Sequence, residues 1–98
     1  MKKSAIVIIM ILSTISLTAS QPHIVALFTP HSHTYNNTTI PYRLFVPQNY
    51  DSTQVYPLVL TLHGSGQRGS DNLSQIISFR LATAWADPIN QANFPCFV

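Results

Sequence analysis

The sequence predicts an α/β fold, in which helices cover a largely parallel β-sheet. Tyr56 to Leu62 ("YPLVLTL") ends in a continuous apolar run, which is typical of a strand buried on both faces of such a sheet. A glycine-rich segment, a helical pattern and a second apolar stretch at residues 95–98 follow in the order of a β-α-β unit. Because the last stretch is too short to complete that unit, we expect the 98 residues to be the N-terminal part of a larger domain.

Residues 1–20 have the layout of a secretory signal peptide. Met1-Lys2-Lys3 is a basic start, residues 5–17 ("AIVIIMILSTISL") are mostly apolar, and small residues just before Gln21 suit cleavage there. The alternative is an uncleaved membrane anchor, but the apolar run is shorter than the roughly 20 residues that a spanning helix needs. The sequence therefore predicts export to the periplasm or the extracellular space, a mature domain at residues 21–98, and no stable membrane anchor after cleavage.

Three strands are expected before the glycine-rich segment. Residues 24–28 are a short apolar run and form the first candidate, whereas residues 29–39 are polar and rich in turn formers. Residues 40–46 ("IPYRLFV") alternate in the manner of a half-buried strand. After a loop rich in turn-forming residues, Pro57 opens the third strand at residues 57–62, because proline at the first strand position costs no needed ladder hydrogen bond.

A helix is expected from about residue 72. Residues 70–72 ("SDN") offer N-cap side chains, and the apolar residues that follow recur at the i, i+3, i+4 spacing of one helix face. These apolar residues are Leu73, Ile76, Ile77 and Leu81. Asp87-Pro88 is expected to end the helix, residues 88–94 to form a connecting loop, and residues 95–98 ("PCFV") to begin the next strand.

The segment between the third strand and the helix, "LHGSGQRGSDN" at residues 62–72, has three possible interpretations. Its glycines spell the G-x-G-x-x-G pattern of a dinucleotide site, but the acid needed about 20 residues later, Asp87, lies at a helix end and not after a strand. A phosphate loop needs lysine and then serine or threonine where the chain has Ser70 and Asp71. The third interpretation is a turn whose backbone N–H groups stabilise the oxyanion of acyl transfer, for which glycines leave the approach open.

Charge and cysteine content bear on the possible partners. Lys2 and Lys3 are the chain's two lysines, so the mature part keeps three arginines against three aspartates and a formal charge of zero. A nucleic-acid partner would need a clustered basic face, which this composition does not support. The single cysteine, Cys96, cannot form an internal disulfide, so we expect a buried thiol or a partner cysteine outside these residues.

Residues 40–98 resemble a known family. The stretch "PYRLFVPQNYDSTQVYPLVLTLHGSGQRGSDN" is similar to the opening of secreted α/β-hydrolases of the predicted-peptidase and polyhydroxybutyrate-depolymerase-like esterase group, which share a "YRLYVP" strand and turn and then a strand and loop with "LHG", "RG" and "DN". The later "WADPINQANFPCFV" is similar to their stretch before the next strand. The resemblance implies the N-terminal part of an α/β-hydrolase fold and a serine hydrolase that acts on ester or amide bonds without a metal or organic cofactor.

The same resemblance implies roles within the glycine-rich segment. The backbone N–H of Ser65 would be one oxyanion-hole donor, with Gly66 as the alternative donor. Gly64 and Gly66 would shape the turn. His63 would anchor the loop and would not act as the catalytic base.

The catalytic triad is not expected in these residues. Such hydrolases carry the nucleophile on a G-x-S-x-G turn, with the acid and the histidine after it. Ser65 is flanked as H-G-S-G-Q, and no histidine follows Asp71 or Asp87. We therefore expect the triad beyond Val98 and an inactive 98-residue chain, whose full-length parent acts on a small ester- or peptide-type substrate. The alternative function is a non-catalytic secreted binding module with a hydrolase-like sheet.

Two weaker patterns complete the expectations. Arg68 could pair with Asp71 and brace the loop, and the alternative is that both charges are solvated, since an exposed ion pair contributes little. His31 and His33, with His23 nearby, could suggest a metal site, but histidines in a polar loop without a carboxylate are expected to be solvated. The sequence therefore predicts no metal site.

Overall fold

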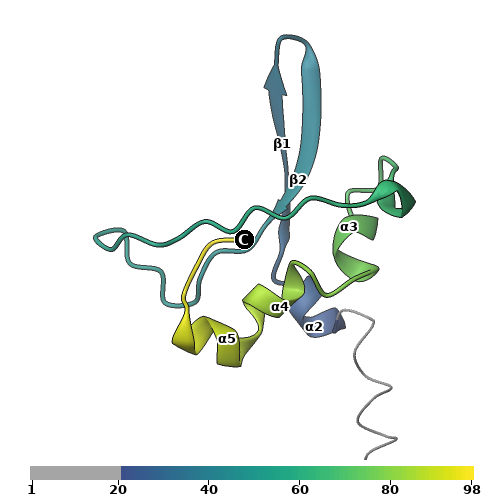
Figure 1. Cartoon of the computed structure of the whole chain (residues 1–98). Helices are drawn as coiled ribbons and strands as arrows, with labels where there is room; N and C mark the ends of the chain where they lie inside the picture. The colour runs from purple at the N-terminus through teal and green to yellow at the C-terminus, as the bar shows by residue number, and fades with distance from the viewer. Residues whose placement is uncertain (1–20) are drawn as a thin grey trace, which may run out of the picture.

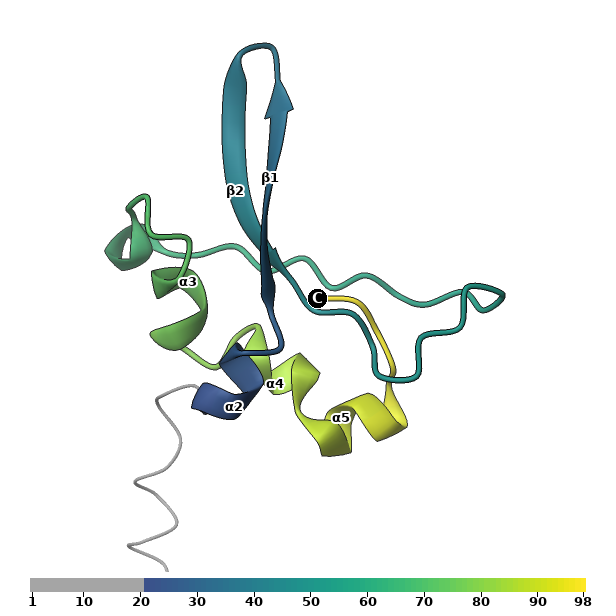
Figure 2. The ribbon, with the colours of Figure 1, turned by 180° about the vertical axis from the view of Figure 1, so that it is seen from behind.

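The structure, a computed structural model, describes residues 21–98, and the predicted signal peptide lies outside the described residues. Figure 1 shows an upright hairpin, extended segments that cross near its base, and a row of short helices beneath them. Figure 2 shows the same arrangement from behind. Within residues 21–98, no helix has the length and apolar character needed to cross a membrane.

The first apolar run forms a helical turn, so the strand expected at residues 24–28 is wrong. Helix α2 covers Pro22–Val25, and Pro22 stands in its first turn, where the missing N–H of proline has no intrahelical partner to lose. The chain keeps turning to residue 28, and Ile24 and Phe28 are both 2 % exposed. Their spacing of four residues places them on one side of a helical turn, which a short apolar run alone does not reveal.

The polar stretch that was expected to be irregular contains a strand and a tight turn. Strand β1 (Thr29–Tyr35) pairs antiparallel with β2 (Thr38–Leu44), which lies two residues earlier than the strand expected at 40–46. Asn36 and Asn37 join the strands with φ of 45° and 62°, as in a two-residue hairpin turn in which both central residues have positive φ. Polar composition concealed β1 because every residue of this strand is exposed.

Residues 57–62 are extended, but they are not the strand buried on both faces that was expected. Leu58, Leu60 and Leu62 are 70 %, 78 % and 75 % exposed. Leu58 forms a parallel bridge with Phe97, supported by backbone hydrogen bonds of 2.8 and 2.9 Å. The direction of this bridge agrees with the expected β-α-β order, but pairing within residues 21–98 does not continue along the run.

The C-terminal segment lies between two extended segments. Val98 exchanges backbone hydrogen bonds of 2.9 and 3.2 Å with Phe45, one residue beyond β2. On its other side, Phe97 pairs with Leu58. The chain end marked C lies accordingly beside both traces in Figure 1. Residues 95–98 therefore begin to pair on both sides, in agreement with the start of a strand that their apolar character predicted.

Three short helices replace the single helix expected from residue 72. They are α3 (Ser74–Ile77), α4 (Thr83–Ala86) and α5 (Pro88–Asn93). Helix α5 occupies most of the segment expected to be a connecting loop. The carboxylate of Asp87 accepts a hydrogen bond of 3.0 Å from the amide of Ile89, so Asp87 caps the start of α5. The Asp-Pro pair that was expected to end a helix thus also begins one.

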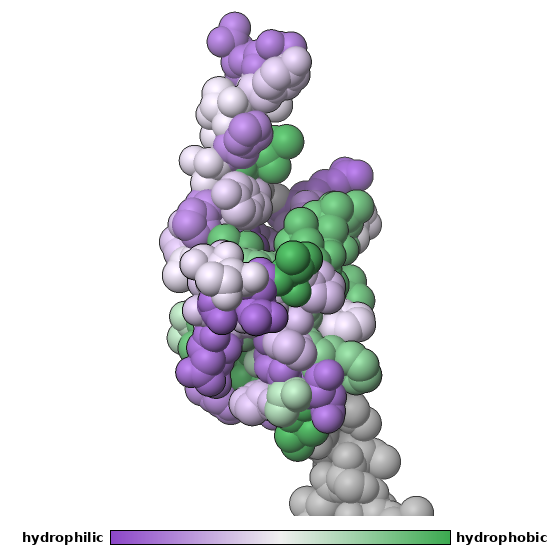
Figure 3. Space-filling model, turned by 90° about the vertical axis from the view of Figure 1, so that its left-hand side faces the viewer, coloured by the Kyte–Doolittle hydropathy of each residue, from purple (hydrophilic) through white to green (hydrophobic). Residues whose placement is uncertain are grey.

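A small apolar core lies between the helices and the extended segments. Its buried members are Ile24, Phe28, Phe45, Ile76, Ala82, Ala86, Cys96 and Val98. The rings of Phe28 and Phe45 lie 5.6 Å apart, so the N-terminal turn packs against the end of β2. The space-filling view in Figure 3 shows a hydrophilic hairpin tip above a body whose surface mixes hydrophilic and hydrophobic residues. Only part of the chain's apolar surface is therefore buried in this core.

Candidate functional site

The glycine-rich segment forms a tight turn at the end of the extended run. The 3-10 helix η1 covers Ser65–Gln67. The amide of Gln67 donates to the carbonyl of Gly64 at 3.2 Å, and the amide of Arg68 donates to the carbonyl of Ser65 at 3.4 Å. These bonds turn the chain away from the direction of residues 57–62, as the oxyanion interpretation requires.

Two backbone N–H groups of this turn are available to a ligand. Within residues 21–98, the amides of Ser65 and Gly66 donate no hydrogen bond, and both residues are exposed. A side chain built at Gly66 would meet nothing within 4 Å, so the space beside this residue is open. Unpaired N–H groups at an open turn can donate to a ligand oxygen.

Gly69 is the glycine of this loop whose backbone conformation requires glycine. Its φ is 152°, which side-chain-bearing residues rarely adopt. At Gly64, by contrast, φ is −88°, and a Cβ there would lie 3.4 Å from the side chain of Gln67. Glycine therefore provides open space at position 66 but not at position 64, and the positive φ comes three residues after Gly66.

His63 and Gln67 connect parts of the loop to one another. The Nδ1 of His63 donates to the carbonyl of Gly64 at 2.8 Å, and the amide of Gly64 donates to Oε1 of Gln67 at 3.2 Å. Because a carbonyl only accepts, His63 carries a proton on Nδ1 in this contact. Sequence reasoning missed Gln67, although its spacing of three from Gly64 matches that of a capping box.

Asp71 caps helix α3 and does not brace the loop. Its carboxylate accepts from the Oγ of Ser74 at 2.6 Å and from the amides of Leu73 and Ser74 at 2.9 and 3.2 Å. The Ser74 hydroxyl first, and then the two amides, hold the pKa of Asp71 below its ordinary value because they stabilise the ionised form. Among the described residues no ion pair joins Asp71 to Arg68, so the expected brace between them is not formed.

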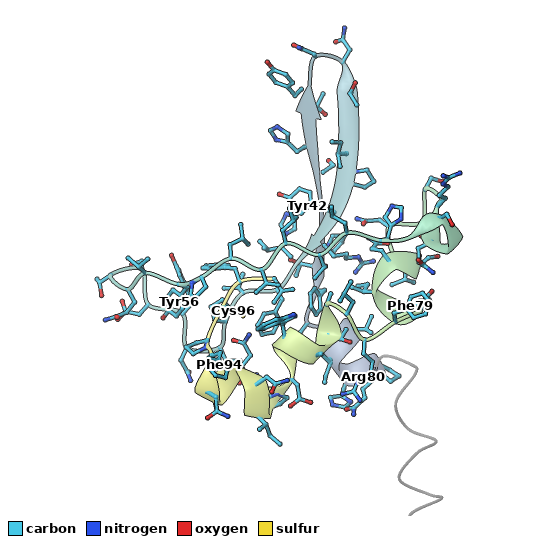
Figure 4. The ribbon with its side chains drawn as sticks, in the orientation of Figure 1. Tyr42, Tyr56, Phe79, Arg80, Phe94 and Cys96 are labelled. Carbon is cyan, nitrogen blue, oxygen red and sulfur yellow. The ribbon has the colours of Figure 1, made fainter. Side chains whose placement is uncertain are left out.

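An open hollow of about 770 Å³ lies between β2 and the extended run that leads into the loop. Its wall is mainly apolar and includes Leu58, Leu60 and Leu62. His63 and Gly64 line it where the run meets the loop. Figure 4 shows Tyr42, another lining residue, where β2 and the extended run cross. The candidate oxyanion donors therefore stand close to an apolar concave surface.

The remaining candidate side chains lie apart from this loop. His31 lies on the hairpin, where its Nε2 is 2.8 Å from the Oγ1 of Thr29 and its ring stacks on Tyr42. No three His, Cys, Asp or Glu side chains of residues 21–98 are grouped so that they could hold a metal ion. The buried thiol of Cys96 accepts from Nε2 of Gln91 at 3.3 Å. These contacts are structural and offer no nucleophile to the loop.

Comparison with known proteins shows a likeness to a solved esterase structure. No family model matches the chain, and no curated protein matches it. A solved structure described as a thermostable esterase is 43% identical, with a TM-score of 0.73, over 76% of this chain and 21% of that chain. The chain therefore spans about a fifth of that esterase's length. The described chain matches a fragment of an esterase fold.

Proposed function

We propose that this chain is the N-terminal part of an exported serine hydrolase that cleaves ester or amide bonds. The observation that carries the proposal is that the amides of Ser65 and Gly66 donate no hydrogen bond within residues 21–98, in a chain similar to a thermostable esterase. Acyl transfer builds negative charge on the carbonyl oxygen, and one well-placed N–H donor stabilises it by about 3 kcal/mol. The loop after residue 62 would supply this stabilisation.

In the proposed reaction, a serine from residues that follow Val98 attacks the substrate carbonyl carbon. A histidine accepts the hydroxyl proton and passes it to the leaving alcohol or amine, and water then repeats the sequence on the acyl-enzyme to release the acid. The amide of Ser65 and the amide after the nucleophile hold the oxyanion in both steps. His63 keeps its Nδ1 proton on the carbonyl of Gly64 and orients the loop. The scheme uses no metal or organic cofactor.

The 98-residue chain alone is expected to be inactive. Its carboxylates after Ser65 bond to the starts of helices, because Asp71 accepts from the amide just before α3 and from the first amide of α3, and Asp87 accepts from an amide of α5. Ser65 is exposed, and within residues 21–98 its hydroxyl contacts no histidine that could act as a base. The chain as given should therefore hydrolyse p-nitrophenyl butyrate no faster than buffer.

The decisive experiment reads the coding sequence past Val98 and assays the polypeptide that it encodes. A G-x-S-x-G followed by aspartate and histidine, together with p-nitrophenyl butyrate hydrolysis that serine-to-alanine replacement abolishes, supports the proposal. A stop codon after Val98, or a longer polypeptide that hydrolyses no ester or peptide, refutes it. Either result favours the secreted binding module, whose apolar ligand would occupy the hollow of about 770 Å³.

Export is tested separately. Residues 1–20 are fused to a phosphatase that is active only outside the cytoplasm, and the N-terminus of the exported chain is sequenced. Phosphatase activity and a mature N-terminus at Gln21 are expected. An inactive fusion, or an uncleaved chain that stays in the membrane, contradicts export by a cleaved signal peptide.

A further inference from the structure

We infer that Asn72 and Arg43 form a clasp that positions the candidate oxyanion loop against β2. The Asn72–Arg43 clasp is the set of hydrogen bonds that these two residues make between the end of the loop and the hairpin. Its catalytic consequence rests on the proposed function. Its contacts and their effect on the loop can be tested without any catalytic activity.

Asn72 reaches β2 through both its side chain and its backbone. Its Nδ2 donates to the carbonyl of Tyr42 at 3.0 Å, and its own carbonyl accepts from Nε of Arg43 at 2.7 Å. Its Oδ1 accepts from Nε2 of Gln75 in helix α3 at 2.6 Å. One residue therefore joins the loop, β2 and α3, across about thirty residues of sequence.

Arg43 fixes the other side of the clasp. Its Nη1 donates to the carbonyl of Phe28 at 3.0 Å, while its Nε bonds Asn72, and the side chain is half-buried. The planar guanidinium holds two carbonyls at a fixed mutual angle, which the single ammonium of lysine cannot do. Since the ring of Phe28 is in the core, the clasp ties the loop to a well-packed part of the chain.

Among residues 21–98, the loop makes no other hydrogen bond to β2. Within residues 21–98, the polar contacts of residues 63–70 stay inside the loop. A small hollow of about 50 Å³ lies between the loop and β2, and it is lined by Pro41, His63, Gln67, Gly69, Asn72 and Gln75. Without the clasp, residues 63–71 would be held at one end by the extended run and at the other by the short helix α3. Asn72 and Arg43 are therefore positioning residues for the amides of Ser65 and Gly66.

The test uses Asn72→Gly and a matched control. Asn72 has φ of 51°, so glycine keeps the backbone conformation and removes the side-chain bonds to Tyr42 and Gln75. Asn49 has φ of 57° in an exposed turn outside the loop, so Asn49→Gly makes the same chemical change there. Backbone ¹⁵N relaxation of the full chain then compares the two variants with the unaltered protein.

In Asn72→Gly, the order parameters of the Ser65 and Gly66 amides should fall from about 0.85 to below about 0.6. Those of Phe45 and Val98, which lie in the core, should not change, and Asn49→Gly should alter none of the four. Unchanged values at Ser65 and Gly66, or values already below about 0.6 in the unaltered chain, overturn the inference.

If Asn72→Gly does not fold, a second variant tests the clasp instead. Asn72→Asp keeps an acceptor for Gln75 but replaces the donor to the carbonyl of Tyr42 with an ionised oxygen that this carbonyl repels, so the same loss of order is expected at the loop amides. Arg43→Lys should also release the loop, whereas Arg68→Lys should not, because the side chain of Arg68 makes no hydrogen bond or ion pair within the described residues. Equal effects of the two lysine variants contradict the clasp.

Kinetics separate positioning from general stability. In a hydrolytically active polypeptide that contains these residues, Asn72→Gly should lower kcat about ten- to a hundred-fold, because a displaced donor stabilises the transition state poorly. KM should stay within about two-fold, as for an interaction made in the transition state, and Asn49→Gly should change neither constant. A change in KM alone overturns the catalytic part. If the unaltered polypeptide hydrolyses no ester, the proposed function fails, and the order parameters still decide on the clasp.

Discussion

Replacing Gln91 by leucine should loosen the C-terminal segment selectively. Gln91 is 8 % exposed, and its Nε2 donates to the carbonyls of Trp85 at 2.7 Å and Cys96 at 3.2 Å. Its Oε1 accepts from the amide of Cys96 at 3.3 Å. Leucine has a similar size, so the substitution removes polar partners while it leaves the packing volume nearly unchanged.

The expected loss of stability follows from these contacts. Three backbone groups around Gln91 lose their hydrogen-bond partner. Each loss should cost about 1 kcal/mol, the lower end of the range for buried groups, because Trp85 and the neighbouring surface are partly open to water. The more apolar side chain regains about 1 kcal/mol. The free energy needed to open the C-terminal segment should therefore fall by about 2 kcal/mol, which corresponds to about a thirty-fold larger population of the open state.

The chain's single cysteine reports this opening. Cys96 is buried, so a thiol reagent such as DTNB labels it only when the segment opens. Under native conditions, Gln91→Leu should raise the labelling rate about thirty-fold. Asn93→Ala is the control, because within residues 21–98 the exposed side chain of Asn93 in the same helix bonds only to the carbonyl of Ile89. Equal labelling of Gln91→Leu and the unaltered chain, or a rise as large in Asn93→Ala, would refute the reasoning.

Three further perturbations test the core, a helix cap and the hairpin turn. Phe45→Ala should lower the free energy of unfolding in urea by about 3–5 kcal/mol, because it removes a 2 % exposed ring that packs on Phe28, and a loss below about 1 kcal/mol would contradict this core placement. The lowered pKa of Asp71 makes its cap fully effective above its unfolded pKa of about 4, and the stabilisation is lost as pH falls through the folded pKa. Asp71→Asn should therefore reduce the fall in melting temperature between neutral pH and about pH 2 that circular dichroism records, and an unchanged profile would speak against the cap. Asn37 has φ of 62°, so Asn37→Val should destabilise the hairpin by about 1 kcal/mol while Asn37→Gly should not, and equal hairpin amide exchange in the two variants would contradict the turn geometry.

Local sequence patterns predicted two of the extended segments, although not the burial of the first. The apolar run at residues 57–62 is extended, and residues 95–98 pair with its start in the parallel direction. Strand β1 was missed because hydrophobic alternation cannot reveal a strand that is exposed on both faces. For this strand, the paired asparagines of the turn were the available signal. The helix at Pro22–Val25 was missed because a run of five apolar residues fits either period.

Some features of the candidate site were likewise predicted from local sequence, and others were not. Glycine spacing and the preceding apolar run predicted where the loop turns, and the amides of Ser65 and Gly66 in this turn donate no hydrogen bond within residues 21–98. Asn72 and Arg43 were not predicted as its supports, because their contact joins residues 29 positions apart and leaves no local pattern. Such a contact becomes visible only once the hairpin has been placed beside the loop.

The expected Arg68–Asp71 pair is not formed within the described residues, because the backbone between the two charges is not helical. Residues three apart face each other on a helix, but Arg68 has the extended ψ of 144° and Gly69 has φ of 152°, so the chain between the two charges is not helical. Asp71 is then free to cap α3. The loop is held instead by Arg43, which bonds two carbonyl groups. Because carbonyls do not titrate, this hold on the loop does not depend on an ionised carboxylate, whereas the cap of α3 does.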